Sequence, residues 1–133
     1  MADAVQKHPQ WPWLESVRGV GPVLAALMMA EIGDVTRFRS IPALWRYAGL
    51  AVKEGKAERR QRGVATAYNP RLKTTMYLVG TRMIMHRSSY REVYDRYRDV
   101  YDGRGWVKAH AHLAAMRQME KRFLADLWRQ GRR

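Results

Sequence analysis

The sequence predicts an all-α domain of about five helices, with a helix-hairpin-helix element and a basic loop. Apolar residues recur at spacings of three and four, no segment alternates as a half-buried strand does, and Gly and Pro separate the periodic segments. With 133 residues, 47% of them hydrophobic, the chain can bury one conventional core but not two. We therefore expect a flexible N-terminus over residues 1–10 and a single helical domain over residues 11–133.

The first predicted helix runs from Pro22 to Ile32. It is apolar nearly all round, which favours a helix buried on most of its faces. Pro22 suits the first helical position and Gly33 suits the stop. Before it, Trp11 to Leu14 supplies large apolar surface, whereas residues 1–10 lack periodicity and are expected to fray.

A short second helix follows, and then a charged stretch. Ser40 can cap a helix through Tyr47, because its hydroxyl can accept an unpaired backbone N–H, and Gly49 ends that helix. Between Leu50 and Tyr68 the periodicity gives way to charge. We expect a mobile basic loop or a short hairpin there.

Three longer helices complete the fold. Asn69 and Pro70 begin one that reaches about His86, and Ser88 or Ser89 can cap the next, which ends at the glycines 103 and 105. A face of tyrosines and valine at spacings of three and four is expected to pack inward from that helix. The last helix runs from about Trp106 to Trp128, with Leu113, Met116, Phe123, Leu124 and Leu127 directed inward.

The charge of the chain indicates an anionic partner. There are 25 Lys and Arg against 12 Asp and Glu, a net charge of +13, and this self-repulsion favours binding of a polyanion. From Lys53 to Lys73, here called the basic segment, there are seven Lys or Arg and two Glu. Nucleic acid is the commonest partner of such a domain. The alternative is a solvated loop that only aids solubility.

Other classes are disfavoured by composition. Without cysteine there is no disulfide framework and no thiolate metal site. The longest apolar run, Pro22 to Ala30, is too short to span a bilayer, and the N-terminus does not have the order of a signal peptide. We expect a cytoplasmic, nucleoid-associated protein of prokaryotic type, with no membrane partner, no metal and no cofactor.

A glycine hairpin from Ser16 to Pro22 is the candidate phosphate-binding element. Glycines allow a tight turn and a close approach to phosphate, and the following helix offers free N–H groups and a positive dipole end. The alternative is a plain turn between packed helices. Together with the basic segment, the hairpin defines the predicted nucleic-acid phosphate-binding residues: Arg18, Gly19, Val20, Gly21, Lys53, Lys56, Arg59, Arg60, Arg62, Arg71 and Lys73.

Several blocks of residues run in an order that resembles a known family. They are Val17 to Gly21, Ala30 to Asp34, Arg37 to Ser40, Tyr47 to Leu50 and Asn69 to Leu72. The chain resembles, from about Leu14 to Leu127, the helix-hairpin-helix-containing C-terminal domain of insertion-sequence transposases related to pilin-gene invertases, the DEDD-type, RNA-guided recombinases. The resemblance implies a role in DNA transposition and recombination for a mobile element. DNA is then the favoured partner, with guide RNA, a homo-oligomer or a separate catalytic subunit as further possibilities.

The chain departs from this family where chemistry is concerned. The family's acidic metal-binding residues lie in an RNase-H-like N-terminal domain, for which there is no counterpart before Trp11. The family also has a serine, taken to be the nucleophile, after the block that ends at Leu50, and residues 51–59 here contain none. Ser40 is better explained as a cap and Thr66 as a loop residue or phosphate donor. We therefore assign no catalytic residue, and whether the chain is an enzyme is left open.

Three functions are compatible with these features. The first is the DNA-binding domain of a transposase or site-specific recombinase, not catalytic on its own. The second is a protein-assembly module that docks on a catalytic recombinase partner, and the third is a strand-transfer enzyme that uses an unorthodox hydroxyl.

A metal site was also considered on the helix that ends at the glycines 103 and 105. Asp95, Asp99 and Asp102 share helical spacing there, but interleaved arginines favour ordinary salt bridges over a metal site.

Overall fold

The computed structural model describes residues 2–53, 56–57 and 68–132 of the chain. Over these residues the architecture is all-α, as predicted, apart from one pair of two-residue strands. The elements are α1 (Ala2–Val5), α2 (Trp11–Ser16), α3 (Pro22–Ile32), the 3-10 helix η1 (Val35–Arg37), α4 (Ile41–Tyr47), β1 (Val52–Lys53), β2 (Lys56–Ala57), α5 (Pro70–Met85), α6 (Arg91–Gly103) and α7 (Lys108–Gly131). The five predicted helices correspond to α3 to α7, and α1 and α2 are additional short helices.

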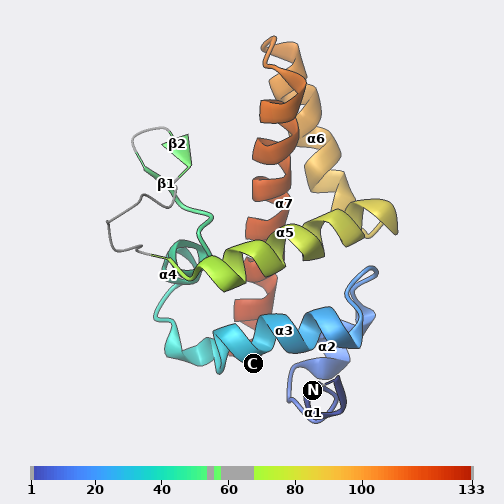
Figure 1. The fold of residues 1–133 in the computed structure, drawn as a ribbon, viewed down its shortest axis with the longest axis vertical. Coiled ribbons are helices and arrows are strands. Elements are labelled where there is room, and N and C mark those ends of the chain that lie inside the picture. Colours follow the sequence, from blue (N-terminus) through green and yellow to red (C-terminus); the bar gives the residue numbers. More distant parts are fainter. Residues whose placement is uncertain (1, 54–55, 58–67, 133) are drawn as a thin grey trace.

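The long helix α7 is the axis of the fold (Figure 1). Helix α6 packs along its outer half, α5 crosses it near the middle, and α3 lies beside α5. Gly80 stands at the crossing, where a Cβ atom would lie 2.9 Å from the Met116 Cε atom of α7. A side chain at position 80 would therefore require the end of the Met116 side chain to shift.

The core lies where α2, α3, α5 and α7 meet. Leu14, Met28, Met76 and Phe123 are among its fully buried side chains. Of the α7 residues predicted to face inward, Met116, Phe123, Leu124 and Leu127 are buried, which confirms that part of the prediction. Leu113 is an exception, since it is 49% exposed. The reason is positional: among the described residues, the outer half of α7 packs against α6 alone (Figure 1), so the opposite face of this half is left to solvent.

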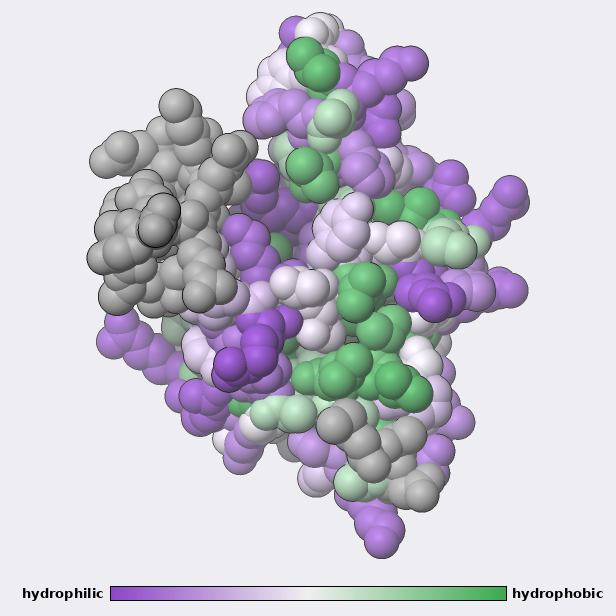
Figure 2. Space-filling view, in the orientation of Figure 1, coloured by the Kyte–Doolittle hydropathy of each residue, from purple (hydrophilic) through white to green (hydrophobic). Residues whose placement is uncertain are grey.

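Helix α3 also differs from the prediction of burial on most faces. Val23 is 62% exposed and Leu27 is 37% exposed. On α5 the side chains of Leu78 and Met85 are exposed as well. Figure 2 shows apolar surface gathered over α3 and α5, so an exposed apolar face lies along these two helices. An all-round apolar pattern therefore did not distinguish a buried helix from one with an uncovered face.

The local capping signals are mostly confirmed. The Ser40 hydroxyl accepts a hydrogen bond from Ala43 N at 3.3 Å, and the Asn69 Oδ1 atom accepts from Arg71 N at 2.9 Å. The expectation for Ser88 and Ser89 is wrong, because α6 begins at Arg91 without a side-chain cap. The Ser88 hydroxyl instead accepts from Tyr90 N at 3.3 Å, within the turn that leads into α6.

The N-terminal residues contact the rest of the domain. Helix α1 packs against α3, Val5 is buried, and the Gln10 side-chain amide donates to the Leu127 carbonyl at 2.9 Å. The absence of periodicity over residues 1–10 therefore did not exclude a helix, because four residues are too few to show a period. The flexibility of this segment stays a prediction.

Candidate nucleic-acid interface

Four side chains from distant parts of the sequence meet at one end of α3 and α5. The Asn69 side-chain amide donates to the Glu31 Oε2 atom at 2.9 Å and to the Tyr47 hydroxyl at 3.0 Å. The Arg71 Nε atom donates to Glu31 Oε1 at 2.7 Å, and the Tyr47 hydroxyl donates to the Glu31 carbonyl at 3.1 Å. We call Glu31, Tyr47, Asn69 and Arg71 the Glu31 network. It unites three of the blocks that carry the family resemblance.

Hydrogen bonds and charge interactions within the Glu31 network favour the ionised form of the Glu31 carboxylate. The hydrogen bond from Arg71 lowers the pKa of Glu31, and the bond from Asn69 adds to this effect. The same Arg71–Glu31 contact raises the pKa of Arg71. The network therefore loses its ion pair when Glu31 is protonated at acidic pH.

The Glu31 network closes the base of the segment between α4 and α5. The backbone N–H of Asn69 donates to the Tyr47 carbonyl at 2.7 Å, so the two ends of residues 48–68 are held side by side. Within that segment β1 and β2 pair antiparallel, with Lys53 opposite Lys56, which confirms the short hairpin for these residues.

Next to the Glu31 network, the Arg37 side chain packs on two aromatic rings, those of Phe38 and Tyr47. The Arg37 guanidinium lies over the Phe38 ring at 4.4 Å and over the Tyr47 ring at 4.9 Å. Its Nε atom donates to the Ile32 carbonyl at 2.7 Å. Phe38 and Tyr47 are themselves in contact, with ring centroids 5.2 Å apart. The two rings are thus held in place before any ligand arrives.

The predicted cations of the basic segment fall into three groups. Arg59, Arg60 and Arg62 lie outside the described residues, and for Lys53 and Lys56 the structure describes the backbone only. Arg71 pairs with Glu31, yet its side chain is 78% exposed. The Lys73 ammonium lies 4.7 Å from the centre of the Tyr68 ring. Arg71 and Lys73 therefore stand at the N-terminus of α5, at the base just described.

The predicted hairpin lies at the other end of α5. Gly19 has φ +96°, and a Cβ atom there would lie 2.8 Å from the Arg82 carbonyl oxygen, so this glycine is required for packing on α5. Val20 is buried and its N–H donates to the Val17 carbonyl at 3.2 Å. Arg18 and Gly21 are exposed. The hairpin can thus offer a ligand its arginine and the uncapped start of α3.

The structure does not bring the hairpin together with those residues of the basic segment that it describes. They lie at opposite ends of α5 (Figure 1), a helix of 16 residues and hence about 24 Å long. The exposed apolar face of α3 and α5 lies between them. Any polyanion that touches both ends must span this distance, which is about seven base-pair steps of duplex DNA.

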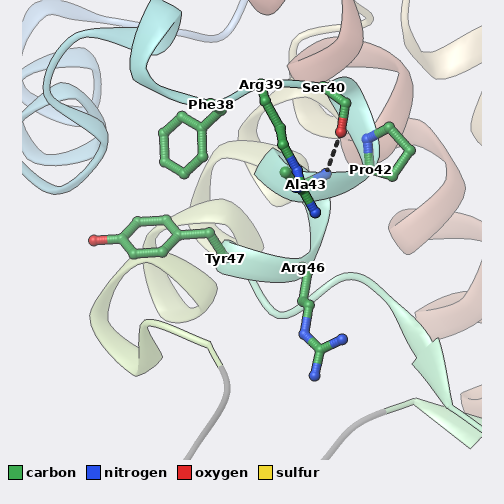
Figure 3. Close-up of a pocket in the computed structure, with 7 residues that line it drawn as sticks. All are labelled: Phe38, Arg39, Ser40, Pro42, Ala43, Arg46 and Tyr47. Atoms are coloured by element: carbon green, nitrogen blue, oxygen red, sulfur yellow. Dashed lines mark hydrogen bonds between the residues drawn. The ribbon is translucent and has the colours of Figure 1, made fainter.

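Sequence reasoning did not single out a pocket on α4. It has a volume of about 430 Å³ and is lined by Phe38, Arg39, Ser40, Pro42, Ala43, Arg46 and Tyr47 (Figure 3). Arg39 and Arg46 are exposed, and neither has an ion pair or a hydrogen bond within the described part of the chain. Three arginines within ten residues, at 37, 39 and 46, were the sequence signal available for it.

The side chains considered for chemistry have other roles in the structure. Ser40 caps α4, and Thr66 lies outside the described residues. Asp95 pairs with Arg91 at 3.6 Å and Asp102 with Arg98 at 3.4 Å, as expected for ordinary salt bridges. Among residues 2–53, 56–57 and 68–132, no three metal-ligating side chains cluster, and no helix has the length and apolar character needed to cross a bilayer.

Comparison with known proteins places this geometry in context. The sequence profile of the transposase IS116/IS110/IS902 family matches residues 12–95, a range that contains both the hairpin and the Glu31 network. The uncharacterized 43.6 kDa protein of insertion element IS110 from Streptomyces coelicolor is 32% identical over 116 residues, which cover 86% of this chain and 28% of that protein. The uncharacterized 44.8 kDa protein of IS116 from Streptomyces clavuligerus is 30% identical over 122 residues, or 86% of this chain and 27% of its own.

A mini-circle protein of Streptomyces coelicolor, a candidate transposase for IS117, is 32% identical over 127 residues. The aligned residues cover 94% of this chain and 29% of that relative. The chain thus spans less than a third of the length of these curated relatives. No solved structure matches the chain significantly.

Proposed function

The chain belongs to the IS116/IS110/IS902 family of transposases, and on this basis we propose that it is a nucleic-acid-binding domain acting in the transposition and recombination of an insertion sequence. The observation that carries the proposal is a set of exposed arginines around Tyr47. Arg39 and Arg46 line the α4 pocket with Tyr47, and Arg71 belongs with Tyr47 to the Glu31 network. Such a surface suits a phosphate backbone.

The hairpin is the second contact in this proposal. Arg18 and the open position at Gly21 lie beside the start of α3, which has no side-chain cap. Its first N–H groups are available to a phosphate oxygen, and the helix dipole favours an anion there. Both contacts grip the backbone without reading bases, so binding is tolerant of sequence and sensitive to salt.

The finer assignment is to the helix-hairpin-helix-containing C-terminal domain of DEDD-type, RNA-guided recombinases. It is supported by the convergence of three resembling blocks in the Glu31 network. In this proposal the chain holds DNA, and guide RNA where one is used, for chemistry done by another part of a transposase. The absence of serine from residues 51–59 supports this division of labour.

Binding of a labelled 20-base-pair duplex by the purified chain tests the proposal. We expect wild-type binding, and about tenfold weaker binding for Arg18→Ala combined with Gly21→Val. The control is Arg96→Ala with Arg122→Ala, which removes two charges from exposed positions on α6 and α7, one more than the hairpin variant removes. A wild-type chain that does not bind, or equal losses in both variants, contradicts the proposal.

A second candidate function, an assembly module that docks on a catalytic recombinase partner, is favoured by the exposed apolar face of α3 and α5. Val23, Leu27, Leu78 and Met85 are its exposed members, and apolar surface of this kind commonly marks a protein contact. Co-sedimentation with the remaining portion of a related transposase tests it. A complex that forms equally well without nucleic acid and is lost in Leu27→Glu supports assembly, whereas a complex that requires nucleic acid supports the first function.

A further inference from the structure

A chain of hydrogen bonds joins α6 to the outer half of α7, and the proposed function does not use it. The Arg98 Nη1 atom donates to the Tyr94 hydroxyl at 2.8 Å, and this hydroxyl lies 2.7 Å from the His112 Nδ1 atom. The Arg98 Nη2 atom also pairs with Asp102 at 3.4 Å. We call Tyr94, Arg98, Asp102 and His112 the Tyr94 latch. We propose that it is pH-sensitive: it holds the outer half of α7 to α6 while His112 is neutral, and it loosens when His112 binds a proton.

The donors of the Tyr94 latch leave one arrangement of protons in which the Tyr94 hydroxyl both accepts and donates. A guanidinium has only donors, so the Tyr94 oxygen accepts from Arg98. The single hydroxyl proton is then donated to the Nδ1 atom of His112, and the imidazole carries its own proton on Nε2. Because Tyr94 is buried, a hydroxyl proton without an acceptor is costly there. The closed latch therefore requires a neutral His112.

Protonation of His112 disrupts this arrangement. An imidazolium donates from both nitrogens, so its Nδ1–H would meet a Tyr94 oxygen that already accepts from Arg98. The hydroxyl proton of Tyr94 then loses its acceptor, and two cations share one oxygen. Burial lowers the pKa of His112, and the charge of Arg98 lowers it further, in agreement with this geometry.

Arg98 is held where it opposes the charge of His112. Its side chain is 25% exposed, and its Nε atom is buried without a hydrogen-bond partner in the described part of the chain. The bonds to Tyr94 and Asp102 offset that loss of water. A second cation beside this incompletely bonded guanidinium adds repulsion that the existing bonds do not relieve.

The groups around His112 offer its positive charge no counterion. From α6, the element packed on this half of α7, the titratable or charged groups are Tyr94, Arg98 and, behind Arg98, Asp102. On α7 itself Lys108 lies one turn before His112. Within the described residues no carboxylate pairs with His112. Protonation thus adds a cation to a place where the nearest charged group is already positive.

The loosening is confined to the outer half of α7. Among the described residues this half packs on α6 alone (Figure 1), and Leu113 on it is 49% exposed. The inner half, by contrast, has Phe123, Leu124 and Leu127 fully buried. Local opening starts where the fewest apolar contacts have to break. The inner half is therefore the internal reference for the test.

Imidazole nitrogen NMR spectra of the full chain from about pH 8 to pH 5 test the protonation state directly. We expect His112, assigned with His112→Gln, to carry its proton on Nε2 at neutral pH and to titrate below the ordinary value of about 6.5. Tyr94→Phe should raise this midpoint, because the hydroxyl that favours neutral His112 is gone. The control is Tyr97→Phe, whose ring packs on Tyr101 in the same helix and which should leave the midpoint unchanged.

Amide hydrogen exchange tests the loosening. Between pH 7 and about pH 5.5, wild type should lose about threefold or more in protection over residues 111–115, with no change over residues 123–127. His112→Gln should lose less than about twofold, because the amide oxygen accepts from Tyr94 as the neutral imidazole does but does not titrate.

Three results would overturn the inference, and the first needs no variant. They are a wild-type His112 that carries its proton on Nδ1 at neutral pH or titrates at or above about 6.5, a midpoint that Tyr94→Phe leaves unchanged, and equal losses of protection in wild type and His112→Gln. None of these measurements involves nucleic acid, so their outcome is independent of the proposed function.

Discussion

The two ends of α5 show how similar sequence signals produce different structures. At the hairpin end, Arg18 precedes Gly19, and Gly19 packs closely against the α5 backbone at Arg82. At the α4 end, side-chain hydrogen bonds of the Glu31 network hold the backbone, and Arg39 and Arg46 remain exposed beside a pocket. A glycine-rich turn therefore indicates close packing as readily as ligand binding, whereas exposed arginines without an ion pair in the described part of the chain leave their charge available to an anion.

The largest expected effect is at the hairpin end. Gly19→Val should destabilise the fold by about 2–4 kcal/mol, because the residue has positive φ and its Cβ would meet the α5 backbone. Gly21→Val is the matched control, since φ at Gly21 is −87° and nothing lies within 4 Å of its Cβ position. Urea unfolding measures both. Equal stability of the two variants would show that Gly19 is not a packing glycine.

At the α4 end, Asn69→Ala should cost about 2 kcal/mol. The substitution removes the cap of α5 and the bonds to Glu31 and Tyr47. Thr74→Ala, one turn into the same helix and exposed, is expected to change stability little. Urea unfolding midpoints compare the two. If Asn69→Ala is no less stable than Thr74→Ala, the Glu31 network does not hold this end together.

A smaller effect is expected from protonation of Glu31. Its pKa is lowered in the fold by Arg71 and Asn69, so its contribution to stability is present above the unfolded-state pKa and is lost as pH falls through the folded-state value. Glu31→Gln should therefore be less stable than wild type at pH 7, and the gap should narrow as pH falls below the ordinary pKa of a glutamate, about 4.3. Melting temperatures from pH 3 to pH 7 measure this. A gap that is constant over that range contradicts an ionic role for Glu31.

The parts of the fold that the sequence predicted depend on local signals. Ser40 and Asn69 cap α4 and α5 because both signals lie within three residues of their partners. The expected burial of Leu113 is wrong because burial there depends on which helix covers the outer half of α7. The packing of Gly19 on α5, more than 60 residues away in the chain, also depends on tertiary context.

The candidate site was predictable to a similar degree. The basic segment was evident from composition, and Arg71 and Lys73 do lie at its base. The contact between Glu31 and Arg71 joins residues 40 apart, and neither periodicity nor spacing identifies such a partner. Arg39 and Arg46 lie within the resembling blocks or next to them, yet only the structure places them at one pocket with two rings.

The most direct test of nucleic-acid binding is the salt dependence of the duplex affinity. Each phosphate contact contributes about 0.9 to the slope of log K against log salt. We predict a wild-type slope of about −3 or steeper between roughly 50 and 200 mM salt, and a slope shallower by about 0.9 for Arg18→Ala. An affinity that does not change with salt, or a failure to bind at roughly 50 mM salt, would contradict the account.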